Sequence, residues 1–122
     1  MRTIAGQYLE IISVEYALVP RLKDGRDISD QEFDTFVGNQ HSLANLQAKL
    51  GKVRQISLQY LDLLSEEELV EEVPSGNAWF GTLWLPKMPR AEHFLNIAEH
   101  EFYHTGQLIS YLWAYGEDPY KW

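Results

Sequence analysis

The apolar residues of this chain recur at helical spacing in three long stretches. In the first, residues 3–23, the predicted buried face carries Ile4, Tyr8, Ile11, Leu18 and Leu22. A spacing of three to four residues is typical of an amphipathic helix. Pro20 is expected to kink this helix near its end, and Gly25 is expected to stop it.

The second stretch opens at Ser29, a predicted N-cap that Glu32 completes as a capping box. Its stripe repeats every seven residues at Phe36, Leu43, Leu50, Ser57 and Leu64. We predict one long helix to about Leu64, which Gly38 and Gly51 weaken because glycine disfavours helix. A break near Gly51 is the main alternative.

The third stretch predicts a helix over residues 90–115, ended by Gly116. A second capping signal at Ser65 predicts a short turn after the long helix. Recurring proline and glycine exclude helix from most of residues 74–90, and no convincing strand is visible there. The aromatic residues of this loop are expected to pack over a core edge or, alternatively, to form a wall facing a substrate: Trp79, Phe80 and Trp84.

The composition excludes several classes of function. The 122 residues are 45% hydrophobic and 23% charged, which indicates a single globular domain. There is no cysteine, so disulfides, thiolate metal ligands and a cysteine nucleophile are impossible. The net charge of −8 would repel phosphates, so no nucleic-acid partner is expected. Without a membrane span or an apolar signal region, a cytoplasmic protein is predicted.

Two histidines, His100 and His104, lie four residues apart in the third helix, on the face that is predicted to be buried. At this spacing their Cβ atoms are about 5–6 Å apart, so both rings can reach one metal ion. The ring nitrogens of a buried imidazole need polar partners. For two imidazoles at one place, a bound ion supplies such partners more readily than the groups of a protein core. A hydrogen-bonded pair without metal is the alternative. His93 is too far along the helix to share their ion, and is expected to line a pocket or bond at the helix end.

The string His100-Glu101-x-x-His104 also matches the zinc-peptidase motif, in which the glutamate acts as general base. Such a peptidase needs a third ligand and a substrate cleft with an edge strand. The chain offers no predicted strand and is small for that scaffold. Proteolysis is therefore the weaker interpretation.

The motif His100-Glu101-x-x-His104-x-Gly106-Gln107, with Gly116 and Pro119 behind it, resembles the last helix of the DinB/YfiT-like superfamily of four-helix metalloenzymes. This family is distinct from the DNA polymerase of similar name. The resemblance implies an all-α up-down bundle with a metal held by three histidines, two of them matching His100 and His104. It also implies a helix ahead of the first one here, so that a homodimer would complete the bundle.

The third histidine of that pattern falls on Glu10, in a frame set by Thr3-Ile4 and Glu15. Glu10 is expected to act as the third ligand, because two histidines and one carboxylate bind zinc and non-haem iron. Alternatively, Glu10 only hydrogen-bonds the histidine pair. In a shifted alignment, His41 becomes the ligand instead. Glu15 is interpreted as structural.

The resemblance implies a metal-dependent enzyme of the thiol-dependent transferase or hydrolase type. The expected cofactor is a divalent ion, zinc or nickel first and iron or manganese next. A small-molecule substrate, used together with a low-molecular-weight thiol, is expected as partner. Glu101 is expected to act as base or to orient a ligand, and Gln107 as a polar pocket group. The alternative is a non-catalytic dimeric bundle with a vestigial metal site.

Overall fold

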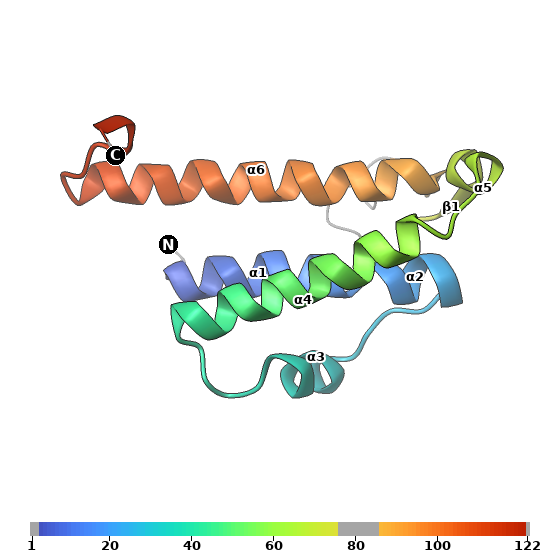
Figure 1. Cartoon of the computed structure of the whole chain (residues 1–122), viewed down its shortest axis with the longest axis horizontal. Helices are drawn as coiled ribbons and strands as arrows, with labels where there is room; N and C mark the ends of the chain where they lie inside the picture. Colours follow the sequence, from blue (N-terminus) through green and yellow to red (C-terminus); the bar gives the residue numbers. More distant parts are fainter. Residues whose placement is uncertain (1–2, 76–85, 122) are drawn as a thin grey trace.

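The computed structural model describes residues 3–75 and 86–121. It is mostly helical, as the sequence predicts, and Figure 1 shows its layers. Helix α6 lies on one side, α1 and α4 lie in the middle, and α3 lies on the other side. The elements are α1 (Ile4–Tyr16), α2 (Leu18–Asp24), α3 (Asp30–Val37), α4 (Leu43–Leu61), α5 (Glu66–Val70), β1 (Glu72–Pro74), β2 (Lys87–Pro89), α6 (Arg90–Ala114) and the 3-10 turn η1 (Pro119–Lys121).

The first predicted helix is present but interrupted at Ala17, between α1 and α2. Pro20 accounts for the interruption, because it has no N–H to donate to the carbonyl of Tyr16 four residues earlier. It is tolerated in the first turn of α2, where such donors have no helical partner. The helix then ends at Gly25, whose φ of 65° is left-handed, as expected for a terminating glycine.

The prediction of one long helix from Ser29 to Leu64 is wrong. The Ser29–Glu32 capping box is confirmed, but α3 stops before Gly38, which has a φ of 75°. The chain restarts at Ser42, whose hydroxyl caps α4 by accepting a hydrogen bond from the Asn45 N–H. The proposed alternative break at Gly51 is also wrong, since this glycine lies inside α4.

The long third helix and the short turn at Ser65 are confirmed as α6 and α5. The prediction that the chain has no strand is wrong, because β1 and β2 form an antiparallel pair with Val73 opposite Met88. Only three residues long and containing proline, these strands carry no alternating pattern that the sequence could reveal. The aromatic residues Trp79, Phe80 and Trp84 lie outside the described residues.

Two apolar clusters hold the helices together. The larger joins α1, α3 and α4 through the buried side chains of Ile12, Val37, Leu46 and Val53. The smaller joins α2 to α6 through Leu18, Leu22 and Ile97. Along the whole of α6 the buried residues are His93, Ile97, His100 and His104. The helix that carries the histidine pair is thus docked on the rest of the chain largely through polar side chains.

None of the helices within residues 3–75 and 86–121 is long and apolar enough to cross a membrane.

Leu46 and Leu43 offer a matched test of the larger cluster. Both lie on α4, but Leu46 is 2% exposed and Leu43 is 53% exposed. Leu46→Ala is expected to lower the free energy of unfolding by about 2–5 kcal/mol, because it leaves a cavity. Leu43→Ala is expected to change it by no more than about 0.5 kcal/mol. Urea denaturation followed by circular dichroism measures both, and equal losses would contradict the described core.

Candidate metal centre

Helices α1 and α6 bring Glu10, His100 and His104 together. One ligand atom from each lies within 4.8 Å of the other two, so the group could hold a metal ion. The two Nε2 atoms are 3.0 Å apart, and a Glu10 carboxylate oxygen lies 3.7 Å from His104 Nε2. His100 is 1% exposed and His104 is fully buried. The three residues that the sequence singles out for the site therefore form one cluster, in which both histidines are buried and Glu10 is partly buried.

The side chain of Gln7 fixes the orientation of the His104 ring. Its amide oxygen bonds His104 Nδ1, and its amide nitrogen donates to the hydroxyl of Tyr111 at 3.2 Å. A carbonyl oxygen can only accept, so Nδ1 carries the proton. In the neutral ring, Nε2 is then left with its lone pair facing His100 and Glu10. This is the arrangement in which a histidine is ready to bind a metal ion.

The spacing of these donors agrees with a common ion. Two nitrogens at 2.0–2.1 Å from a tetrahedral zinc ion would be separated by about 3.3 Å. The observed 3.0 Å needs only a small adjustment. Two imidazoles and one carboxylate also form a ligand set used by catalytic zinc, which leaves a fourth position open. The donor chemistry therefore fits a divalent metal.

His41 lies apart from this cluster. Its side chain is exposed in the link between α3 and α4, where Nε2 lies 2.9 Å from the carbonyl oxygen of Gly38. The structure thus groups Glu10, and not His41, with the histidine pair.

A second polar cluster lies beside the first and joins three helices. Glu15 of α1 is 1% exposed and binds Arg54 of α4 through two contacts, of 2.7 and 3.0 Å. Glu101 of α6 binds the same guanidinium group. The hydrogen bond with Glu15 is the main cause that raises the pKa of Arg54 above its usual value. Glu15 is therefore structural, as predicted, while Glu101 is held by a cation.

The sequence did not point to Gln7 or Arg54. Gln7 precedes Glu10 by three residues, so both lie on one face of α1. A polar residue between the apolar positions Ile4 and Ile11 was the available signal. Arg54 gives no such signal, because an arginine next to a buried valine in a helix is ordinary.

His93 is also buried on α6, and Gln107 is partly buried there, with its amide oxygen shielded from solvent. The Gln107 amide oxygen makes no hydrogen bond to the described part of the chain, so it offers an acceptor inside the protein. Neither ring nitrogen of His93 makes a well-formed hydrogen bond there either. His93 belongs to the region where α6 starts, near Val73 and Arg90.

No protein-family model, curated protein or solved structure matches this chain. The resemblance to the DinB/YfiT-like bundles therefore stays a prediction.

His93 is expected to make stability depend on pH. Burial is the main cause that lowers its pKa; Arg21 and Arg90 lower it further, and the Val73 backbone partly opposes them. The unfolded chain then takes up a proton more readily than the folded one. The stability contributed by neutral His93 is complete above the unfolded pKa of about 6.5 and is lost as the pH falls below it.

His93→Leu should therefore reduce the loss of unfolding free energy between about pH 7 and about pH 5. Urea denaturation at a series of pH values measures this slope. His41→Leu, a change at an exposed residue, serves as control and should show the same slope as the native chain. Equal slopes for all three proteins would show that His93 is not held neutral by the fold.

Proposed function

We propose that this protein binds one divalent metal ion through Glu10, His100 and His104 and acts as a metal-dependent enzyme. The observation that carries the proposal is the bond from His104 Nδ1 to Gln7, which turns the lone pair of Nε2 toward the other two ligands. The Glu10 carboxylate, 3.7 Å from the same Nε2, supplies a third donor of a type that divalent metals bind. Zinc or nickel suits two imidazoles and a carboxylate best, and iron or manganese is the next choice.

A site with three protein ligands favours catalysis over a purely structural role. Structural zinc sites are closed by four protein ligands, whereas catalytic sites keep a position for water or substrate. When bound, the metal would lower the pKa of a water or thiol at that position. The resemblance of the last helix to the DinB/YfiT-like enzymes favours the activity of a thiol-dependent transferase or a hydrolase.

The surrounding side chains have separate tasks in this proposal. Gln7 holds the His104 tautomer, and the Glu10 carboxylate offsets one positive charge of the ion. Glu101 is fixed on Arg54, so it orients the wall of the site more readily than it abstracts a proton. Its bond to Arg54 also argues against the peptidase interpretation, in which the glutamate must serve a metal-bound water. The Gln107 oxygen makes no hydrogen bond within residues 3–75 and 86–121, so it offers an acceptor one turn beyond His104.

A second candidate is a non-catalytic bundle that forms a dimer. One face of α6, opposite the histidines, carries Leu95, Phe102 and Trp113, which are 55%, 78% and 49% exposed. Their spacing of seven and eleven residues keeps them on one line along the helix. An exposed apolar stripe of this kind favours association with a second copy.

Metal content distinguishes the two candidates. Protein made without a histidine tag and analysed by elemental mass spectrometry is expected to carry about one ion per chain. His104→Ala should abolish this, because it removes a ligand, while the exposed His41→Ala should not. Metal retained in His104→Ala, or lost in His41→Ala, would overturn the assigned ligands. A metal-free dimer by light scattering would favour the second candidate.

Gln7 gives a finer test, since it touches a ligand but not the ion. Gln7→Met keeps the shape of the side chain but removes the acceptor for His104 Nδ1. Zinc affinity, measured by competition with a chromophoric chelator, is expected to fall about 10–100-fold. Gln47→Met, an exposed change on α4, is the matched control and should have no effect. An unchanged affinity in Gln7→Met would mean that the ring needs no such support.

Glu10 can be exchanged for the residue that the family pattern places there. Glu10→His is expected to keep a stoichiometric ion, because imidazole is also a ligand for these metals. Glu10→Gln should bind zinc more weakly than either, since the neutral amide is a poor ligand. Chelator competition ranks the three proteins. Equal affinity for Glu10→Gln and the native chain would exclude Glu10 as a ligand.

A further inference from the structure

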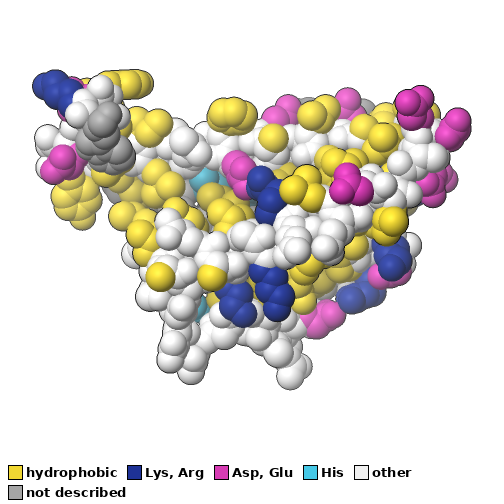
Figure 2. All heavy atoms as spheres, viewed as in Figure 1, with side chains coloured by type: hydrophobic (Ala, Val, Ile, Leu, Met, Phe, Trp, Pro, Cys, Tyr) yellow, Lys and Arg dark blue, Asp and Glu magenta, His cyan; other side chains and the backbone are white. Residues whose placement is uncertain are grey.

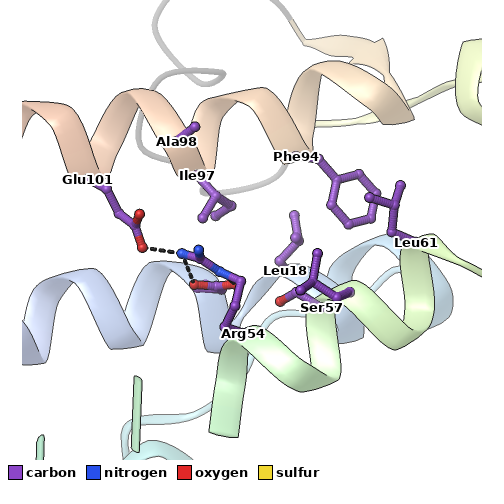
Figure 3. A pocket seen from close by; sticks show the side chains of 10 residues that line it. Leu18, Arg54, Ser57, Leu61, Phe94, Ile97, Ala98 and Glu101 are labelled. Atoms are coloured by element: carbon purple, nitrogen blue, oxygen red, sulfur yellow. Dashed lines mark hydrogen bonds and ion pairs between the residues drawn. The ribbon is translucent and has the colours of Figure 1, made fainter. Parts of the chain in front are cut away.

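A cavity of about 180 Å³ lies between the α1–α2 segment, α4 and α6. Figure 3 shows its arrangement: Phe94 and Leu61 lie at one end, Ile97 and Leu18 face each other across it, and Arg54 and Glu101 lie at the other end. Apolar cavities of about 150 Å³ accept a molecule of the size of benzene. The space therefore suits a compact apolar body with a short polar arm.

The polar end of the cavity carries an excess of negative charge. Glu15 and Glu101 share the single guanidinium group of Arg54, so the three groups sum to −1. Glu15 engages Arg54 through both of its carboxylate oxygens. Glu101 uses one oxygen, and its side chain is 30% exposed, which leaves the second oxygen available to a ligand.

This charge distribution discriminates between ligands. A carboxylate or phosphate would bring a third negative charge to one guanidinium group that is already occupied. An ammonium group would instead bring the cluster to neutrality and could donate to Glu101 in a charge-assisted hydrogen bond. Figure 2 shows hydrophobic side chains exposed in the middle of this face, beside acidic and basic groups. A ligand with a cationic head and an apolar body would thus find complementary surroundings for both of its parts.

We propose that this cavity binds a small primary amine with an aromatic or branched apolar body. Its ammonium group lies on Glu101 and its body lies between Leu18, Phe94 and Ile97. The cavity is close to the metal cluster, because Glu101 follows His100 directly and Glu15 lies about 7.5 Å along α1 from Glu10. A role for the amine as substrate rests on the proposed function, whereas its binding does not.

Three probes of equal size test the charge preference: 2-phenylethylamine, 2-phenylethanol and phenylacetate. Each is titrated into the full chain, with and without zinc, and followed by NMR chemical-shift changes. The amine is expected to bind about tenfold more tightly than the alcohol, with the carboxylate weakest. Carboxylate binding equal to or tighter than amine binding, or no shifts with the amine at millimolar concentration, overturns the proposal. Amine binding in a chain that takes no zinc would sink only the proposed function.

Two pairs of variants locate the site. Glu101→Gln should bring amine and alcohol to similar affinity, while Glu99→Gln, an exposed change on the same helix, should keep the preference. Leu58→Trp fills the mouth of the cavity and should weaken the amine about tenfold. Leu43→Trp, on the same helix and similarly exposed, should not. Because Glu101 and Leu58 are at least partly exposed, folding is expected to survive. If Glu101→Gln still bound the amine more tightly than the alcohol, the amine would lie elsewhere and the proposed site would be wrong.

Discussion

Helix α6 depends on polar contacts for its place in the fold. Three of its four buried side chains are histidines, and Ile97 is the exception. Buried imidazoles stabilise a helix contact only when their nitrogens find partners, since an unsatisfied polar group costs free energy. Gln7 supplies a partner for one of them, and the Nε2 atoms of His100 and His104 lie 3.0 Å apart in a group that could hold a metal ion. The same histidine contacts therefore dock α6 and form the candidate metal site.

The rest of the molecule is held in a different way. Helices α1, α3 and α4 share an apolar cluster that includes stacked rings, with Tyr16 and Phe36 4.3 Å apart. Arg54 connects this apolar half to α6 by binding carboxylates from two other helices. Such a bridge adds specificity more than stability, because desolvation of its charges offsets much of their attraction. It joins α6 to α1, the helix that carries Glu10, through Glu101 and Glu15.

Periodicity was sufficient to predict where helices lie and which face of the last one is buried. It also placed the two histidines on an inward face, whereas Glu10 was suggested by the resemblance to the DinB/YfiT-like pattern and not by periodicity. The break at Gly38 was not, because helical spacing of apolar residues continues across it, and only its φ of 75° ends the helix. Gln7 and Arg54 act through contacts between distant segments. The apolar neighbours of Gln7 hint that it is buried, but a single sequence does not reveal the partner of either residue. The strands at Val73 and Met88 were missed for the same reason, since backbone pairing specified them more than side-chain pattern.

The contact between Gln7 and His104 joins residues 97 positions apart in the chain. Contacts of that separation form late, because the entropy of closing a long loop must be overcome before they stabilise anything. During synthesis, Gln7 and Glu10 leave the ribosome long before α6 exists, whereas the apolar cluster of α1, α3 and α4 needs only the first half of the chain. The donor cluster is thus absent from every partly made chain. Any ion that it holds must arrive after the last helix has docked, so that occupancy of the site reports completed folding.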